Sequence, residues 1–109
     1  MSSVTKLRSS LTPEVMQLSR LDIDDLIIMS LMLEDSTYAE ICYMLKLTPP
    51  AISHRLRKYL EVFGENFLVT WKTKKVLSET GKLFALKARQ ALCSFLDTTD
   101  DLLFKDVKL

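Results

Sequence analysis

The chain has 109 residues, of which 48% are hydrophobic and 27% charged, and its net charge is +1. This length suits one domain with a modest core, and this composition is that of a folded protein rather than a disordered one. No apolar run approaches the roughly 20 residues of a membrane span. No apolar segment follows Lys6 and Arg8, as it would in a secretory signal. We therefore expect a cytoplasmic protein without membrane contact.

The small net charge hides a division along the chain. Residues 1–45 hold three basic and seven acidic residues, residues 46–90 hold ten basic and three acidic ones, and residues 91–109 hold two basic and four acidic ones. A basic segment between two acidic ones is typical of a surface that binds phosphate, although charged runs more often lie on a solvated face.

Helix formers dominate the sequence, which contains only two glycines and three prolines. Residues 1–20 form an N-terminal extension, in which Thr12 caps a short helix that ends near Ser19. Residues 22–33 predict a strong helix that is apolar on nearly all sides, and residues 37–45 predict a shorter one.

The third predicted helix begins at Pro49, with Thr48 as its cap, and stops at Gly64. Its apolar residues recur on one side, and its other side is polar and basic. Two short helices joined by a tight connection, the second of them basic, make a helix-turn-helix, whose second helix fits the major groove of DNA.

After the third helix the hydrophobic period changes from helical to alternating. Residues 67–72 predict a strand, residues 73–75 a turn, and residues 76–78 a return strand. A basic hairpin after a helix-turn-helix makes the winged form, in which the wing holds the DNA backbone. The predicted fold class is therefore mainly α, with a winged helix-turn-helix over residues 21–79.

Residues 80–109 are expected to form a C-terminal linker and dimerisation helix, which runs from Gly81 either to Asp97 or as far as Phe104. Apolar residues at a coiled-coil-like spacing predict the surface that pairs with a second copy of the chain. This stripe consists of Phe84, Ala88, Ala91, Leu92, Phe95 and Leu102.

The sequence offers no catalytic or metal-binding constellation. It holds one histidine, no glycine-rich loop and no nucleophile motif, so an enzyme is not expected. Cys42 and Cys93 lie within apolar helical patterns, and we expect both to be reduced core thiols rather than zinc ligands or a disulfide. We also expect no cofactor and no small-molecule effector, so that regulation comes from protein concentration, dimerisation or a partner.

Four motifs follow one another from the third predicted helix to the end of the predicted hairpin: Pro50-Ala51-Ile52-Ser53, Gly64, the pair Phe67-Leu68, and Leu77-Ser78-Glu79-Thr80-Gly81. With these motifs, the segment from Ser36 to Ala88 resembles the N-terminal DNA-binding domain of the LysR-type transcriptional regulators. No gap separates Pro50 from Gly81, and residues 26–45 align with the family's first two helices. The resemblance implies a bacterial, nucleoid-associated transcription regulator whose chain lacks the family's effector domain.

The chain departs from the family pattern at positions that bear on DNA contact. Pro49 stands where the family commonly has a glutamine, which removes a base-reading amide. Thr70 replaces a usual arginine, which removes one phosphate contact. Ile41 and Cys42 replace small alanines of the second helix, which implies altered packing.

By matching positions, the resemblance implies contacts to bases or backbone from the recognition helix and the wing. These residues are Thr48, Pro49, Pro50, Ser53, His54 and Arg57, together with Lys72, Lys74 and Lys75 of the wing. Arg55 and Lys58 are added from their charge and helix position alone. His54 is alternatively an idle surface residue, the wing lysines are alternatively only solvated, and Trp71 is expected to pack under the wing rather than to wedge into DNA.

Two functions from different classes fit these features. The leading expectation is a sequence-specific regulator that binds double-stranded DNA as a homodimer, with two recognition helices facing successive turns of the major groove. The alternative is a protein-interaction module that pairs with, or recruits, a second regulator without reading DNA itself. The departures at Pro49 and Thr70 support this alternative.

Overall fold

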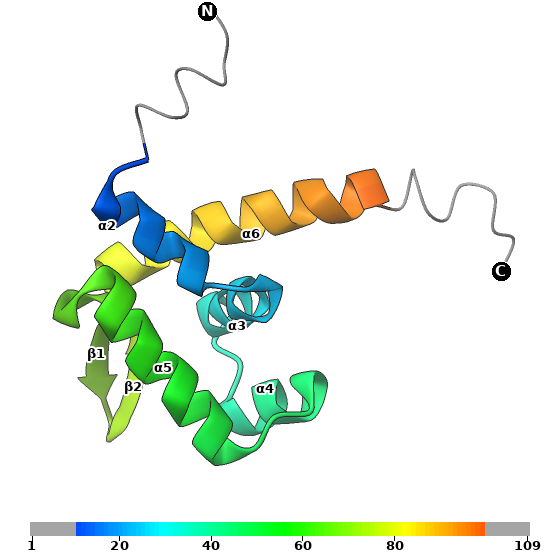
Figure 1. The fold of residues 1–109 in the computed structure, drawn as a ribbon. Coiled ribbons are helices and arrows are strands. Elements are labelled where there is room, and N and C mark those ends of the chain that lie inside the picture. The colour runs from blue at the N-terminus through cyan, green and yellow to red at the C-terminus, as the bar shows by residue number, and fades with distance from the viewer. Residues whose placement is uncertain (1–10, 100–109) are drawn as a thin grey trace, which may run out of the picture.

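The computed structural model describes residues 11–99. As expected, the protein is mainly helical, with one two-stranded antiparallel sheet and a long C-terminal helix. Figure 1 shows the arrangement of α3 (Ile23–Leu33), α4 (Tyr38–Leu45), α5 (Pro49–Phe63) and α6 (Glu79–Thr99). The most extensive contact between helices joins α3 and α6, and α5 lies to one side of them with the hairpin beside it.

The N-terminal extension begins with α2 (Pro13–Met16) and continues as a 3-10 turn, η1 (Gln17–Arg20). The sequence predicts one short helix here, and the structure divides it into an α-helical half and a tighter half. The Arg20 guanidinium pairs with Glu61 of α5 at 2.7 Å, and the Arg20 carbonyl accepts a hydrogen bond from Lys58 at 3.1 Å. These contacts attach the extension to α5.

Two capping boxes fix the starts of α3 and α4. The Asp22 carboxylate accepts a hydrogen bond from the Asp25 backbone N–H, and the Asp25 carboxylate accepts one from the Asp22 backbone N–H. Thr37 and Glu40 exchange the same pair of bonds at the start of α4. Such reciprocal bonds satisfy donors that a helix N-terminus leaves free. Each helix begins one residue after its predicted start, because Asp22 and Thr37 are the caps.

The start and the end of α5 are also confirmed. The Thr48 hydroxyl accepts a hydrogen bond from the Ala51 N–H at 3.3 Å, and the helix ends before Gly64, whose φ is +101°. Residues 46–48 connect α4 to α5. Within this connection Lys46 has a φ of +56°, in the left-handed region that residues with a side chain seldom occupy.

The hairpin follows a 3-10 turn, η2 (Glu65–Phe67), and consists of β1 (Leu68–Trp71) and β2 (Lys74–Leu77). Trp71 pairs with Lys74, so the turn is formed by Lys72 and Thr73 alone, whose φ angles are +48° and +68°. The prediction of a turn over residues 73–75 is wrong, and both Lys74 and Lys75 lie in β2. A two-residue turn with positive φ at both positions is favoured because its twist matches that of the paired strands.

The predicted long helix is confirmed as α6, and Ser78 is the residue that caps it. The Ser78 hydroxyl accepts a hydrogen bond from the Gly81 N–H and donates one to the Phe67 carbonyl, both at 3.0 Å. A Cβ atom at Gly81 would overlap that carbonyl oxygen, so glycine is what allows α6 to approach η2 this closely. Further along α6, Ala85 and Ala88 are buried. Among residues 11–99, no helix combines the length and the apolar character needed to cross a membrane.

An aromatic cluster joins α5, η2 and α6 within the core. The Phe67 ring stacks on the Phe63 ring with centroids 4.3 Å apart, and Phe63 contacts Phe84 with centroids 4.5 Å apart. Tyr59 meets Phe67 edge to face at 6.2 Å. Because η2 leads directly into β1, this cluster fixes the base of the hairpin relative to α5.

Candidate nucleic-acid interface

The N-terminal half of α5 presents a polar face away from the core. Pro50, Ser53 and Arg57 follow one another at spacings of three and four residues, which place them on one side of the helix. The predicted contact residues of this helix that are exposed are Thr48, Pro49, Pro50, Ser53, His54 and Arg57. The residues implied by the family resemblance therefore share one surface.

The wing lysines, Lys72, Lys74 and Lys75, are all exposed on the hairpin. The Lys72 ammonium lies 4.5 Å from the centroid of the Trp71 ring, and the Lys74 ammonium lies 6.0 Å from that of Tyr38. The Tyr38 hydroxyl donates a hydrogen bond to the Lys75 carbonyl. This bond ties the start of α4 to β2, so α4 helps to hold the hairpin in place.

A groove of about 510 Å³ lies between α5 and the hairpin. Its walls include Ser53 and Arg57 from α5, Lys74 and Lys75 from β2, and Tyr38 from α4. The structure therefore brings part of the predicted helix surface and part of the predicted wing surface together, although these residues lie far apart in the sequence.

The cations beside this groove are uncompensated. Arg57, Lys74 and Lys75, which line the groove, form no ion pair with any other residue in the described part of the chain, and neither does Lys72 at the tip of the hairpin. Cations gathered without carboxylate partners create a positive potential that attracts phosphate groups. The groove is thus suited to hold a polyanion.

Arg55 and Lys58 lie on a different side of α5, where they hold the fully buried carboxylate of Asp25. Arg55 Nη1 lies 2.9 Å from Asp25 Oδ1, and Lys58 Nζ lies 2.6 Å from Asp25 Oδ2. The Tyr59 hydroxyl donates to Oδ1 at 2.7 Å, and Arg55 also donates to Asp22 at 2.8 Å. We call these five residues the Asp25 cluster. The sequence predicts DNA contacts from Arg55 and Lys58 because of their charge and helix position, and it gives no sign that they pair with a buried carboxylate.

Hydrogen bonding decides the ionisation of the Asp25 cluster. Burial by itself raises the pKa of the Asp25 carboxyl, but hydrogen bonds from Lys58, Tyr59, the Asp22 backbone and Arg55 lower this pKa to about 2. Burial and the hydrogen bond to Asp25 raise the pKa of Tyr59. Burial lowers the pKa of Arg55, but the carboxylates of Asp25 and Asp22 outweigh this effect and raise it. The cluster is therefore ionised at neutral pH and holds α5 against the start of α3.

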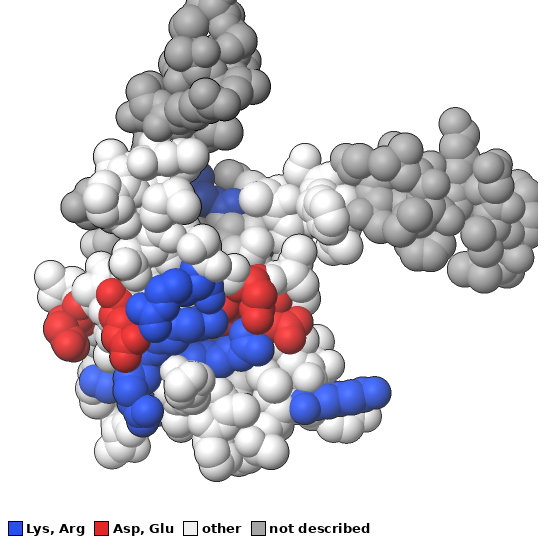
Figure 2. Space-filling view, in the orientation of Figure 1, with Lys and Arg blue, Asp and Glu red and all other residues white. Residues whose placement is uncertain are grey.

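The face of the molecule over η1 and the upper part of α5 carries matched charges. Figure 2 shows that the central patch of Lys and Arg side chains in this view is bordered by Asp and Glu side chains on both sides. The ion pairs here are those of the Asp25 cluster and the pair between Arg20 and Glu61. This face is therefore less attractive to a polyanion than the groove beside the wing.

The predicted dimerisation stripe of α6 divides between the core and the surface. Phe84 belongs to the aromatic cluster and Ala88 is 5% exposed, so both serve the core of the protomer itself. Leu92 is partly buried, whereas Ala91 and Phe95 are exposed. The remaining member of the stripe, Leu102, lies outside the described residues.

The two cysteines differ in their surroundings. Both are free, and Cys42 is partly buried in α4, whereas Cys93 is exposed on α6. The prediction that Cys93 is a core thiol is wrong, because an apolar pattern continues along α6 into a part of the helix that is largely exposed. Within residues 11–99, no group of three His, Cys, Asp or Glu side chains is placed to hold a metal ion.

Two residues that shape the candidate interface were not among the predicted site residues. In the sequence, Asp25 is one of several acidic residues at a helix start, and Tyr38 is one of the apolar residues of the helix predicted over residues 37–45. Their partners Arg55 and Lys75 lie 30 and 37 residues away, and a local pattern carries no signal for contacts of that range.

Comparison of the chain with protein-family models, with curated proteins and with solved structures finds no match. The likeness to the LysR-type regulators therefore rests on the sequence motifs.

Proposed function

We propose that this protein is a sequence-specific DNA-binding transcription regulator of the winged helix-turn-helix type that acts as a homodimer. One observation carries the proposal: Ser53 and Arg57 of α5 line the same groove as Lys74 and Lys75 of the hairpin, and the three cations among them have no ion-pair partner among residues 11–99. The motifs that resemble LysR-type regulators support it from the sequence.

In this proposal the N-terminal half of α5 enters the major groove. Ser53 and Arg57 reach the edges of bases, where an arginine reads guanine through two hydrogen bonds. Thr48 lies at the positive end of the α5 dipole, which favours a phosphate. The wing lysines hold the DNA backbone. Arg55 and Lys58 are left out of the interface because the Asp25 cluster holds their charged groups.

The second half of α6 is the proposed surface for a second copy. Leu96 is 50% exposed there and Leu92 is partly buried, while Phe84 and Ala88 are committed to the core. Pairing of this helix with its copy about a twofold axis would give a dimer with two α5 helices, and binding to two DNA half-sites requires that both face the same side of the dimer.

Selection of DNA fragments with the purified protein, followed by anisotropy titrations of the enriched site and of a random duplex, tests the proposal. Arg57→Ala should weaken binding to the enriched site by about 1–3 kcal/mol, and binding to the random duplex by less. Arg20→Ala is the matched control, because Arg20 pairs with Glu61 near the far end of α5. Failure to enrich any fragment, or equal losses for both variants, contradicts the proposal.

Salt dependence tests the wing separately. Each wing lysine that contacts a phosphate should contribute about 0.9 to the slope of log affinity against log salt concentration. Replacing one wing lysine with alanine should lower this slope for the enriched site and the random duplex alike. An unchanged slope for all three variants would place the wing away from the DNA backbone.

A second candidate function is a protein-interaction module that pairs with another regulator without reading DNA. The exposed apolar side chains on α4 and α6 favour it, with Tyr43 at 87% and Met44 at 59% exposed on α4 and Leu96 at 50% on α6. A protein that enriches no DNA fragment alone, and that forms a stable complex with a second regulator, would support this function instead.

A further inference from the structure

A smaller cavity, of about 260 Å³, lies between the end of α3, the connection from α3 to α4, and the hairpin. We call it the wing cavity. Its walls include Met32, Tyr38, Trp71 and Leu77, and its lining also includes the charged residues Asp35 and Lys74. Of the lining residues only Lys74 and Lys75 belong to the predicted DNA-binding set, so most of the cavity wall has no role in the proposed function.

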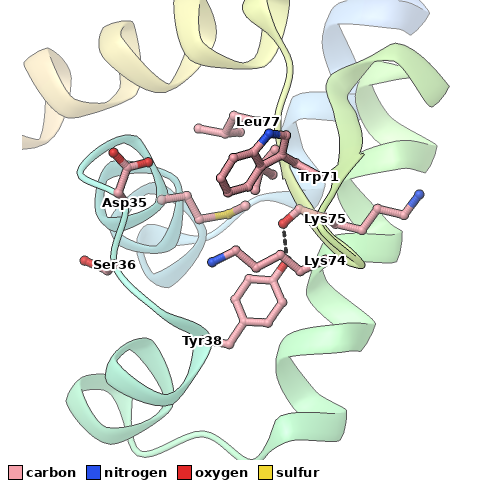
Figure 3. Close-up of a pocket in the computed structure, with 9 residues that line it drawn as sticks. Asp35, Ser36, Tyr38, Trp71, Lys74, Lys75 and Leu77 are labelled. Carbon is pink, nitrogen blue, oxygen red and sulfur yellow. Dashed lines mark hydrogen bonds between the residues drawn. The ribbon is translucent and has the colours of Figure 1, made fainter.

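The walls of the wing cavity are suited to an apolar group. Figure 3 shows the rings of Trp71 and Tyr38 on opposite sides, with the side chain of Lys74 reaching between them toward the connection from α3 to α4. Trp71 is 56% exposed, so the largest side chain of the protein leaves much of its apolar surface uncovered. Covering such an aromatic surface stabilises a complex through apolar burial and ring contacts.

Two opposite charges accompany these walls. Figure 3 shows the Asp35 carboxylate on the connection between α3 and α4, on the side toward which the Lys74 chain extends. Neither group forms an ion pair with any residue in the range 11–99. Asp35 has a φ of +62°, a conformation that costs energy for a residue with a side chain. A separated carboxylate and ammonium can each bind the opposite charge of one small zwitterion.

We infer that the wing cavity binds a free α-amino acid with an apolar side chain. The ligand ammonium pairs with Asp35, the ligand carboxylate pairs with Lys74, and the ligand side chain lies against Trp71 and Met32. The volume suits a molecule of this size, because it is below the roughly 300–1,000 Å³ of pockets for larger ligands.

Binding at this site would act on DNA through Lys74, and this consequence rests on the proposed function. Lys74 lines both the wing cavity and the groove beside α5. A ligand carboxylate that holds the Lys74 ammonium removes one cation from the groove. The amino acid should therefore lower DNA affinity, with the largest effect at low salt.

Trp71 is the only tryptophan of the chain, so its fluorescence reports on the cavity directly and without DNA. The standard amino acids, titrated one at a time into the purified protein at constant ionic strength, test the binding. At least one with an apolar side chain should change the Trp71 emission in a saturable way at concentrations up to about 1 mM, and glycine should not. No saturable change with any of them overturns the inference.

Matched variants and ligand derivatives test the two charge contacts. Asp35→Asn and Lys74→Met should each weaken binding by about tenfold or more. Glu34→Gln and Lys87→Met remove the same charges outside the cavity lining and should leave affinity unchanged. N-acetylation of the ligand removes its ammonium charge, so it should weaken binding to the wild type but cause no additional loss in Asp35→Asn. Conversion of the ligand carboxylate to an amide should weaken binding to the wild type but cause no additional loss in Lys74→Met. Equal binding by all variants, or by both derivatives, contradicts the assigned contacts.

The fluorescence titration separates the two proposals. If the protein binds the amino acid but enriches no DNA fragment, the ligand site is supported and the proposed DNA-binding function is contradicted. If the protein binds DNA but its fluorescence does not respond to any amino acid, only the ligand site is contradicted.

Discussion

Replacing Asp25 with asparagine should destabilise the fold strongly while leaving the shape of the side chain almost unchanged. Asp25 is fully buried, and its carboxylate is the common acceptor for Arg55, Lys58 and Tyr59. Removing one partner from a buried ionic cluster costs about 3–5 kcal/mol, because the remaining charges lose their counter-ion. Arg55 and Lys58 retain 20% and 16% exposure, so water can partly solvate them and we expect about 3 kcal/mol.

Urea unfolding followed by far-ultraviolet circular dichroism measures this loss, and Asp24→Asn is the matched control. Asp24 is 43% exposed and lies 3.9 Å from Arg55, so its loss should cost less than about 1 kcal/mol. A cost below about 1 kcal/mol for Asp25→Asn, or equal costs for both variants, would refute the argument that this carboxylate holds α5 in place.

The Asp25 cluster also predicts how stability depends on pH. The pKa of Asp25 is about 2 in the folded protein against an ordinary value of 3.8. A lowered carboxyl pKa contributes stability that is present above the unfolded value and is lost as the pH falls through the folded one. The wild type should therefore lose about 2 kcal/mol between pH 4 and pH 2 from this group. Asp25→Asn should lose correspondingly less over the same range.

Three backbone positions give further predictions, all measured by the same urea titration. Gly81→Ala should cost at least about 2 kcal/mol, because the new methyl group meets the backbone carbonyl of Phe67, and a neutral result would mean that α6 can shift without penalty. Lys46→Gly should stabilise the protein by about 1 kcal/mol by relieving a left-handed residue, whereas Lys87→Gly, the same change within α6, should destabilise it by a similar amount. Thr73→Gly should likewise stabilise the hairpin turn by about 1 kcal/mol, and a loss of stability would argue against the two-residue turn.

The elements that the sequence predicts well are those with local signals. Thr37 and Thr48 cap the helices that follow them, and Gly64 ends α5 with a positive φ. In each case the deciding interaction lies within a few residues, so the side-chain type at one position is enough to place the boundary.

The errors arise where distant parts of the chain decide the outcome. The hairpin turn lacks the glycine or asparagine that usually marks a two-residue turn, and the pairing of Trp71 with Lys74 places it one residue earlier than expected. Helix position alone made Arg55 and Lys58 candidates for the interface. Only the buried carboxylate of Asp25, from a helix 30 residues earlier, shows that their charges serve the fold.

The Asp25 cluster changes what the charge distribution means for DNA binding. The sequence offers six cations for the interface, and two of them, Arg55 and Lys58, are neutralised by acids from the N-terminal segment. The acidic segment, residues 1–45, therefore neutralises part of the positive charge of the basic segment, residues 46–90, within the fold. The three wing lysines give three phosphate contacts per protomer and a salt slope of about −5.4 for the dimer, whereas five contacts per protomer, with Arg55 and Lys58 added, give about −9.0. A measured slope near the larger magnitude would mean that DNA draws Arg55 and Lys58 away from Asp25. The protein would then have to give up about 3 kcal/mol of its stability to bind, and Asp25→Asn should increase its DNA affinity rather than leave it unchanged.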